Sequence, residues 1–412
     1  MSPEVGAPRN SLNTLKHSNR HSVLELLRHA SPLSIAEIAE RTGLSKVTVT
    51  KSVDHYLNEG VVVSTGKGES GEDGGKRPNM FAFNRNHRSI FCVKIDEAHL
   101  LAALTDLEGN IVASHTAFYD ARTDLSRVLD CVRDAFHLLM ERQGLEASQC
   151  IGAVVGCHGV IDPELGICFT SPHFSGWGVD IPLRELVRRA LPRGMEVHVN
   201  NWIHFHAYGE VHAMRINVDR FFVIGTESEG VAGGLVIDGR MYRGSGSLSG
   251  EIAHMIVDTT REAERCVCGG RGCFEAAVSP LRMAARANAL LREHPDSLLA
   301  RTGRGMATFA DITAAANAGD AFARTLIDEC IGHWAIAVTN ILQICDPELI
   351  IIQGVYAEAG RYFLSGLQER IQTVSLVNMR KTVDIAYSTL GDEGTILGAG
   401  RYLADRHFAG HA

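Results

Sequence analysis

Three cysteines lie within eight residues of this chain, Cys266, Cys268 and Cys273, and His254 stands twelve positions before the first of them. The spacing is H-x11-C-x-C-x4-C, and the sequence GGRG between the last two cysteines allows a tight loop. Three thiolates and one imidazole are the donor set of a closed tetrahedral zinc site. Since the protein fills all four positions, the pattern predicts a structural Zn2+ ion and leaves no place for a catalytic water. A redox-active thiol cluster and three core cysteines without a metal are the alternatives.

Two carboxylates flank the expected metal loop. Glu251 precedes His254 by three residues on a segment with the pattern of a helical turn, and Glu275 follows Cys273 by two residues. If zinc fixes the loop, both carboxylates are held near one place, where they can accept hydrogen bonds from the hydroxyl groups of a small polyol. The alternative is that each is a solvated or helix-capping side chain.

The other seven cysteines lie scattered in apolar segments, and we expect them to be small buried side chains. No apolar run approaches the ~20 residues that span a bilayer. The first residues of the chain also lack the apolar core of a secretory signal. We therefore expect a cytoplasmic protein without a membrane partner, in which the thiols stay reduced.

With 412 residues the chain exceeds the size of a single hydrophobic core, so we expect two or three domains. Its charge is unevenly placed. Residues 1–88 carry 12 Lys and Arg against 9 Asp and Glu, whereas the remainder carries 28 against 39. We expect contact with nucleic acid only in the N-terminal part, because the rest of the chain repels a polyanion.

Apolar residues recur at helical spacing between Arg20 and Glu59 and predict three short helices. Ser34, with Glu37 three residues later, has the pattern of a capping box, and Ser45 follows a glycine turn as the next helix cap. Helix, glycine turn and helix together indicate a helix-turn-helix, whose last helix enters the major groove of DNA. The expected base and phosphate contacts of that helix are Ser45, Lys46, Thr48, Thr50 and Lys51.

A β-branched segment, a glycine-rich loop and an alternating segment follow between Val61 and Asn84. This order is typical of the β-hairpin wing of a winged helix-turn-helix. We expect Lys76 and Arg77 in the wing to contact the DNA. The alternative for residues 66–75 is a flexible linker, since the loop also contains acidic side chains.

From Ser89 onward the pattern changes to long segments of mixed α/β character. Strand-like and helix-like segments alternate, and the order of strand hairpin, helix, strand, helix and strand occurs twice. Such duplicated halves predict two α/β lobes that face each other across a ligand-binding cleft.

The sequence resembles the ROK family, which is named for bacterial repressors, open reading frames and sugar kinases. The resemblance covers nearly the whole chain and rests on the helix-turn-helix with GGKRP at the end of its wing, HGVIDPELGICFTSPHFSGWGVDIPLREL, IDGRMYRGSGSLSGEIAHM, CVCGGRGCFE and GTILGAGRYL. It implies an actin-like, ribonuclease-H-like domain of two lobes, a structural zinc ion, and homodimers or homotetramers. In the repressor branch of the family, a sugar in the cleft alters the attached DNA-binding domains.

The division that we expect has three parts. Residues 1–88 form the winged helix-turn-helix, and residues 89–200 form the first lobe, onto which a C-terminal helix at 391–412 packs back. Residues 201–390 form the second lobe with the zinc site and the oligomer interface.

The chain departs from the pattern of the family's sugar kinases at three places. Asp96 is present in the D-x-G-x-T loop that holds phosphate, but Ala98 and Leu100 replace the glycine and the threonine, and a leucine cannot donate a hydrogen bond. The second phosphate segment reads GTESEG, with two glutamates where an anion would lie. Asn201 replaces the catalytic aspartate, and an amide does not take the proton of a sugar hydroxyl. We therefore expect that kinase activity is lost.

Glu251, His254 and Glu275 match sugar contacts of the family, whereas His173 and Asn201 replace its usual asparagine and aspartate. We expect a sugar or sugar derivative as ligand. The expected function is a DNA-binding transcriptional regulator of carbohydrate-metabolism genes, a repressor rather than an enzyme, that binds a palindromic operator. One alternative is a bifunctional ATP-dependent sugar kinase with a DNA-binding domain, and another is a DNA-binding protein whose cleft binds nothing.

Overall fold

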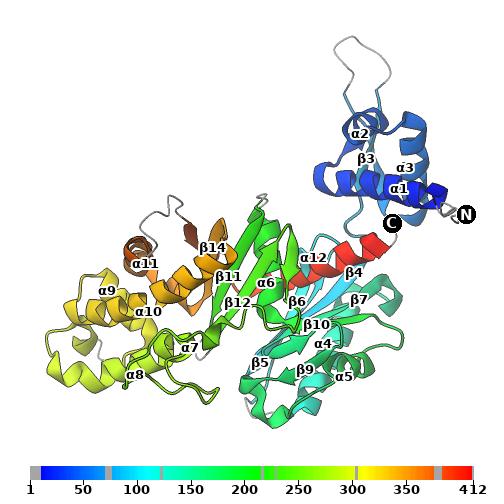
Figure 1. Ribbon diagram of the computed structural model, residues 1–412. Helices are drawn as coiled ribbons and strands as arrows, with labels where there is room; N and C mark the ends of the chain where they lie inside the picture. Colours follow the sequence, from blue (N-terminus) through cyan, green and yellow to red (C-terminus); the bar gives the residue numbers. More distant parts are fainter. Residues whose placement is uncertain are drawn as a thin grey trace, which may run out of the picture.

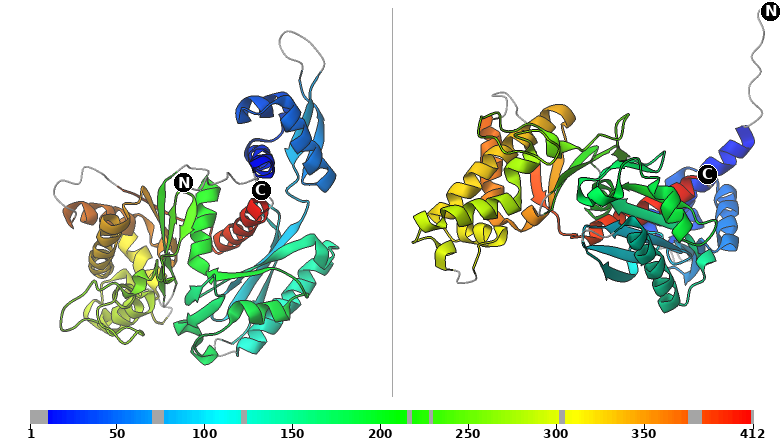
Figure 2. Two further views of the ribbon diagram at one scale, coloured as in Figure 1. Left: turned by 45° about the vertical axis from the view of Figure 1, so that its right-hand side comes forward. Right: turned by 90° about the horizontal axis from the view of Figure 1, so that it is seen from below.

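The computed structural model has an N-terminal domain with a three-stranded sheet and two larger lobes that each contain a five-stranded sheet (Figure 1). The two lobes lie side by side, and the N-terminal domain stands next to the C-terminal helix (Figure 2). Within the described residues no helix combines the length and the apolar character of a membrane span. The structure describes residues 11–69, 77–120, 124–214, 218–227, 230–301, 305–374 and 383–410.

The N-terminal domain is a winged helix. Both helix starts expected from the sequence are confirmed. The amide of Glu37 donates to Ser34 Oγ at 3.3 Å in the capping box of the second helix, and Ser45 Oγ accepts from the amide of Thr48 at 3.2 Å at the start of the third. The elements are α1 (Ser11–Ala30), β1 (Leu33–Ser34), α2 (Ile35–Thr42), α3 (Lys46–Glu59), β2 (Val62–Lys67) and β3 (Asn79–Phe83), with the sheet order β1-β3-β2.

The first lobe contains the sheet β10-β7-β4-β5-β6. Its central strand β4 (Ser89–Ile95) is completely buried, as its apolar sequence predicts, while the edge strand β6 (Ile111–Phe118) alternates between half-buried and exposed residues. The remaining elements are β5 (His99–Thr105), α4 (Leu125–Gln143), η1 (Ala147–Gln149), β7 (Cys150–Cys157), β8 (Val160–Asp162), β9 (Ile167–Thr170), η2 (Pro172–Trp177), α5 (Leu183–Ala190) and β10 (Val197–Asn201).

The second lobe contains the sheet β13-β12-β11-β14-β15 and a group of helices on its outer side (Figure 1). Its longest helix, α10 (Ala321–Cys345), buries an apolar stripe that includes Trp334. The other elements from here to the C-terminus are α6 (Trp202–Met214), β11 (Arg220–Thr226), β12 (Val231–Ile237), β13 (Arg240–Tyr242), η3 (Ile252–His254), α7 (Phe274–Val278), α8 (Pro280–Leu290), η4 (Leu291–Glu293), η5 (Leu298–Arg301), α9 (Phe309–Asn317), β14 (Leu349–Gly354), η6 (Val355–Glu358), α11 (Gly360–Val374), β15 (Asp384–Tyr387) and α12 (Glu393–Gly410).

The two large sheets share one topology. In the first, β4 and β5 as well as β5 and β6 pair antiparallel, while β4 pairs parallel with β7 and β7 parallel with β10. In the second, β11, β12 and β13 repeat the antiparallel part, and β11, β14 and β15 repeat the parallel part. The duplication that the sequence predicted is therefore confirmed.

Helices α6 and α12 join the two halves. Helix α12 packs on the first sheet, α6 packs on the second, and the two helices lie side by side (Figure 2). Glycines permit this close contact, because a Cβ atom at Gly398 would lie 1.8 Å from the carbonyl oxygen of Phe205. The packing of α6 on α12 therefore forms a direct contact between the two halves.

The far end of α12 also contacts the N-terminal domain. The rings of Phe83 and Phe408 lie edge to face with centroids 5.7 Å apart, and the guanidinium of Arg28 lies 5.2 Å from the centroid of Phe408. Both aromatic side chains belong to one buried cluster that includes residues of α1, β3, β4 and α12. The winged helix and the first lobe therefore share part of a hydrophobic core.

Candidate functional site

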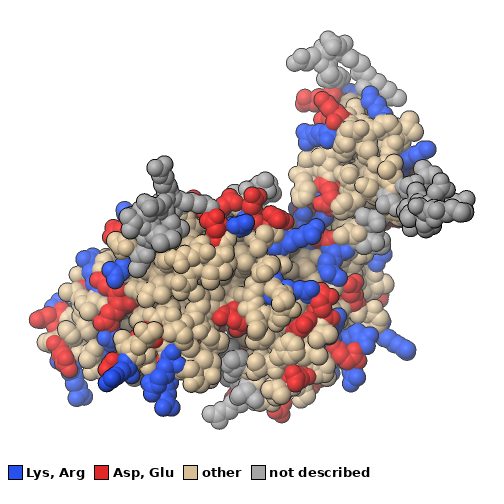
Figure 3. Space-filling view, in the orientation of Figure 1, with Lys and Arg blue, Asp and Glu red and all other residues tan. Residues whose placement is uncertain are grey.

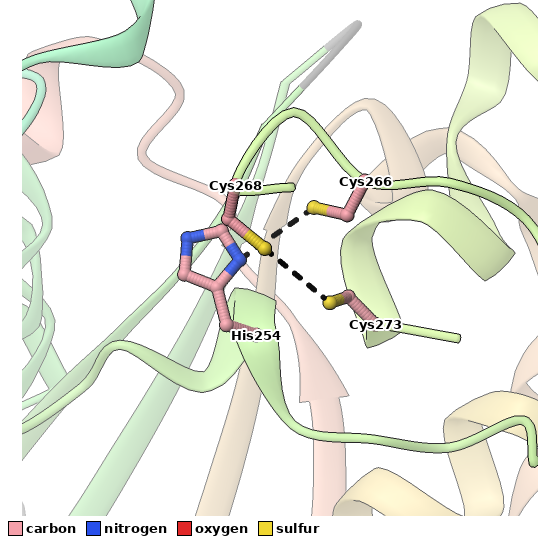
Figure 4. Close-up of side chains that lie close together, drawn as sticks. All are labelled: His254, Cys266, Cys268 and Cys273. Atoms are coloured by element: carbon pink, nitrogen blue, oxygen red, sulfur yellow. Dashed lines mark hydrogen bonds between the residues drawn. The ribbon is translucent and has the colours of Figure 1, made fainter. Parts of the chain in front are cut away.

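The metal-binding pattern of the sequence is assembled in space. One potential ligand atom from each of His254, Cys266, Cys268 and Cys273 lies within 4.8 Å of the others. His254 Nδ1 is 3.7 Å from Cys266 Sγ, and the sulfurs of Cys268 and Cys273 are 3.6 Å apart. Figure 4 shows the four side chains pointing toward one another, with His254 Nε2 directed away from the sulfurs. This cluster can hold a metal ion.

The cysteine loop is shaped by backbone contacts. The amide of Cys266 donates to the carbonyl of Gly270 at 2.9 Å, which closes the turn that carries Cys268. Gly272 has φ +70°, and a Cβ atom there would lie 1.8 Å from the carbonyl oxygen of Asp258. At Gly270 a Cβ atom would lie 3.4 to 3.5 Å from two cysteine sulfurs. Glycine at position 272 therefore lets the loop pack closely against Asp258. Three sulfurs with one nitrogen are the donors that zinc prefers.

A cavity of about 740 Å³ lies beside this cluster, between the lobes. The structure brings four expected ligand contacts together in its lining, namely Asn201, Glu251, His254 and Glu275. His173 belongs to η2 by its backbone, but its side chain lies outside the part of the chain that the structure describes.

The two glutamates of the cavity are held differently. Glu275 is 8% exposed and accepts hydrogen bonds from the amide of Val231 at 3.3 Å and from the thiol of Cys266 at 3.7 Å. Glu251 is the N-cap residue of η3, and its side chain makes no capping hydrogen bond. Burial raises the pKa of Glu251, and the charge of Glu275 acts in the same direction while His254 opposes it.

Asn201 is occupied by contacts within the protein. Its side-chain amide donates to the carbonyl of Gly159 at 3.0 Å, and its carbonyl oxygen accepts from the amide of Ile203 at 3.2 Å. The residue therefore fixes the loop after β7 to the first turn of α6. Trp202, which follows it, is 1% exposed and packs as a core residue.

A buried lysine at the base of the cleft was not anticipated from the sequence. Lys94 Nζ lies 3.1 Å from Asp96, 3.2 Å from Glu227 and 2.8 Å from Asp392, and 4.7 Å from the ring centroid of Trp202. Burial lowers the pKa of the Lys94 ammonium, but Glu227, Asp96 and Asp392 together raise it above its ordinary value. Since Lys94 belongs to β4 and Glu227 follows β11, this cation links the two lobes.

His158 lies beside the same group. Its Nδ1 accepts from the indole N–H of Trp202 at 3.1 Å, and its Nε2 is 3.0 Å from Asp96 Oδ1. Because an indole only donates, the proton of the imidazole is on Nε2 and is donated to Asp96. A second group with donor atoms suited to a metal ion consists of Asp96, His158 and Glu227. The ammonium of Lys94 already supplies a cation there, at 3.1 Å from Asp96 and 3.2 Å from Glu227.

The loop that resembles the kinase phosphate loop has a different role. The amide of Asp96 donates to the carbonyl of His99 at 2.9 Å, so the segment is a tight β-turn between β4 and β5. Leu100 is fully buried in the core of the first lobe. Its replacement of threonine therefore serves packing, and no hydroxyl faces the cleft at this position.

The expected DNA contacts lie at the start of α3. Ser45, Lys46, Thr50 and Lys51 are exposed, and Thr48 is half-buried. On the face seen in Figure 3 the N-terminal domain presents both basic and acidic side chains, so this face is not uniformly basic. Arg77 is exposed at the base of the wing, whereas Lys76 lies outside the described residues.

Sequence analysis also missed Val47, which is 65% exposed on α3 beside Lys46. The sequence could have indicated this residue, because Val47 lies three and four positions before Thr50 and Lys51 and so shares their outward helix face. A β-branched apolar side chain at such a place can contact the methyl group of thymine.

The fold and these sites were compared with known proteins. Residues 90–406 match the ROK family, which is more than three quarters of the chain. The chain belongs to the ROK family. Residues 17–63 of this ROK protein match a winged helix-turn-helix DNA-binding domain.

The relatives of this ROK protein include transcriptional repressors of similar length. It is 27% identical to the xylose repressor of Bacillus subtilis (strain 168) over 396 residues, which cover 96% of each chain. It is 25% identical to the DNA-binding transcriptional dual regulator NagC of Escherichia coli (strain K12) over 402 residues, 97% of this chain and 95% of NagC.

A crystal structure of a ROK family transcriptional regulator, a homologue of E. coli MLC protein, has the same fold. It matches with a TM-score of 0.79 at 21% identity and covers 96% of this chain and 98% of its own. The expected fold, a winged helix-turn-helix followed by a ROK domain, is thereby confirmed.

Proposed function

We propose that this ROK protein is a transcriptional repressor of carbohydrate-metabolism genes that acts in the cytoplasm and responds to a sugar or sugar derivative in the cavity between its lobes. One observation carries the proposal: an exposed helix suited to the major groove and a ligand cavity are joined by continuous contacts in a single chain. The sequence relationship to the xylose repressor and NagC supports the same function.

The recognition helix would bind operator DNA through Ser45, Lys46, Thr48, Thr50 and Lys51, with Arg77 and Lys76 of the wing on the adjacent backbone. Because each chain presents one such helix, a homodimer or homotetramer would place two of them in successive major grooves of a palindromic site.

A path of three side chains connects the cavity with the DNA-binding domain. Helix α6 begins at the cavity with Trp202, and Tyr208 at its midpoint donates from Oη to Asp405 Oδ2 at 2.6 Å. The other oxygen of Asp405 accepts from Arg28 of α1 at 2.5 Å. The Arg28 side chain is only 1% exposed, whereas the Asp405 side chain is 27% exposed. A ligand that moves α6 would move Asp405 and with it the winged helix.

We further propose that the metal in the His254, Cys266, Cys268 and Cys273 cluster is zinc and that its role is structural. Zinc would tie η3 to the cysteine loop and so fix Glu251 and Glu275 as acceptors for sugar hydroxyls. A ligand with different affinity for two arrangements of the lobes then shifts their equilibrium.

Kinase activity is not part of this proposal. Asn201 occupies the place of the general base and is already bonded on both sides. Glu227 carries negative charge where the family places a phosphate, and Lys94 fills the adjoining space with a cation of the protein itself. These features would disfavour the binding of ATP and the transfer of its phosphoryl group.

The test uses the full-length, zinc-loaded protein. Its operator is selected from a pool of random DNA, and fluorescence anisotropy then measures DNA affinity with each member of a panel of hexoses, pentoses and N-acetylhexosamines. We expect one sugar class to weaken binding at least about tenfold. If no specific DNA is selected, or if no sugar changes the affinity, the proposal is wrong.

A second assay separates the repressor from the bifunctional kinase. ATP consumption is measured with the same sugars. Sugar phosphorylation that disappears in Asn201→Ala would establish the kinase alternative, whereas we expect none above background.

A further inference from the structure

We propose that the cavity selects a sugar without negative charge, neutral or amino-substituted, and rejects phosphorylated sugars and sugar acids. This inference rests on the proposed function, because it concerns the ligand of the same cavity. It is carried by the distribution of fixed charge around the cavity.

Carboxylates from both lobes line the cavity. Glu97 comes from the first lobe, and Glu227, Glu251 and Glu275 come from the second. A ligand in this space therefore faces carboxyl groups from both lobes. A phosphate ester would bring up to two more negative charges into a partly desolvated cavity, where like charges repel strongly.

Two cations in or beside the described part of the cavity, Lys94 and Arg282, are already paired. Lys94 is not part of the lining, and its ammonium lies between Asp96, Glu227 and Asp392, which leaves that group with an excess of negative charge. Arg282 does line the cavity, but its guanidinium donates to Glu264 at 2.8 Å and to the carbonyl of Arg265 at 2.6 Å. Neither cation is placed to receive a phosphate.

His158 is also occupied by contacts within the protein. The indole of Trp202 donates to its Nδ1, so in this arrangement the ring carries a single proton, on the nitrogen that faces Asp96. With both ring nitrogens occupied, His158 offers no donor to a phosphate group.

Two backbone amides at helix starts near the cavity are also occupied. At the start of α6 the amide of Ile203 donates to the side chain of Asn201, and at the start of α8 the amide of Arg282 donates to Ser279 Oγ at 3.4 Å. Phosphate sites are commonly built from such amides at helix starts. Here the side chains of the same chain already use them, which again favours hydroxyl groups over an anion.

The experiment is isothermal titration calorimetry on the full-length, zinc-loaded protein. Matched probes are glucose, glucosamine and glucose 6-phosphate, then N-acetylglucosamine and its 6-phosphate, then xylose and glucuronic acid. We expect the tightest binding among the uncharged and amino sugars, and at least about 100-fold weaker binding of the phosphate ester of any sugar that binds. A phosphate ester that binds as tightly as its parent sugar overturns this inference and leaves the proposed function intact. Absence of binding by every probe overturns both.

Two variants test the cause. Neutralising the acidic wall with Glu97→Gln and Glu227→Gln together should reduce the discrimination against the phosphate ester by about tenfold, and added salt should reduce it in the wild type. A purely structural effect of these changes would weaken both ligands alike. Glu141→Gln, an exposed position on α4, is the matched control and should leave the discrimination unchanged. Equal discrimination in the double variant and the wild type would contradict the charge argument.

Discussion

Replacement of Asp405 by asparagine tests the link between the cavity and the DNA-binding domain. Asp405 holds Arg28 and Tyr208 at 2.5 and 2.6 Å, and the variant removes its charge with little change of shape. Loss of one partner from a buried ion pair costs about 3–5 kcal/mol. The Asp405 side chain is 27% exposed and Glu25 still lies 2.7 Å from Arg28, so we expect a smaller loss of about 1–2 kcal/mol in the free energy of unfolding.

The more specific effect of Asp405→Asn concerns regulation. The ratio of the DNA dissociation constants with and without the sugar measures the coupling between the two sites, which amounts to about 1–3 kcal/mol in typical allosteric proteins. We expect this ratio to fall at least about fivefold, because the carboxylate that connects α6 with α1 is lost. The affinity for DNA without sugar and the affinity for the sugar itself should change much less.

Fluorescence anisotropy with the selected operator measures both dissociation constants. Tyr208→Phe, which removes only the donor to Asp405, should lower the ratio in the same way, and the double variant should not lower it further than the larger single effect. Asp130→Asn on the exposed face of α4 is the control for the loss of a surface carboxylate. If Asp405→Asn and Tyr208→Phe both keep the full response to sugar, the signal does not pass through these contacts.

Three further outcomes are expected. Cys268→Ser should lose the bound metal, melt at a lower temperature and respond more weakly to the sugar, and a variant with full metal content and full response would refute the structural role of zinc. Lys46→Ala and Lys51→Ala should each weaken DNA binding and reduce the slope of log affinity against log salt by about one unit, and an unchanged slope would remove that lysine from the interface. Burial lowers the pKa of His204 from its ordinary value of 6.5 to about 4. Below about pH 6.5 the unfolded chain therefore binds a proton at this residue that the folded protein does not bind. Stability measured in urea should therefore fall by about 1.5 kcal/mol between pH 6.5 and pH 5 through this group. His204→Leu should show a flatter pH dependence, and an equally steep dependence in that variant would contradict this origin.

Local features of the fold were predictable from the sequence because their signals are local. Ser34 and Glu37 are three residues apart, so the capping box is visible without a structure. The cysteine loop is equally short, and only His254 had to be added from a little further away. The strand pattern revealed the duplication because both halves repeat the same order of elements.

The lysine cluster and the regulatory path were not predictable in this way. A lysine in an apolar strand is unusual, and this alone could have singled out Lys94 in the sequence. Its partners Glu227 and Asp392 are 133 and 298 positions away. No spacing rule brings such residues together. Leu100 was read as a failed phosphate contact, and only its burial shows that it belongs to the core.

The contact between Arg28 and Asp405 joins residues 377 positions apart, and Phe408 completes the hydrophobic surface around Phe83. Ribosomes extend a chain by about 5–20 residues per second, so the N-terminal domain is synthesised roughly 20–75 s before helix α12. Until then the ring of Phe83 lacks its aromatic partner Phe408, and Arg28 has Glu25 as its carboxylate partner. Helix α12 thus completes the hydrophobic core of the N-terminal domain only late in synthesis.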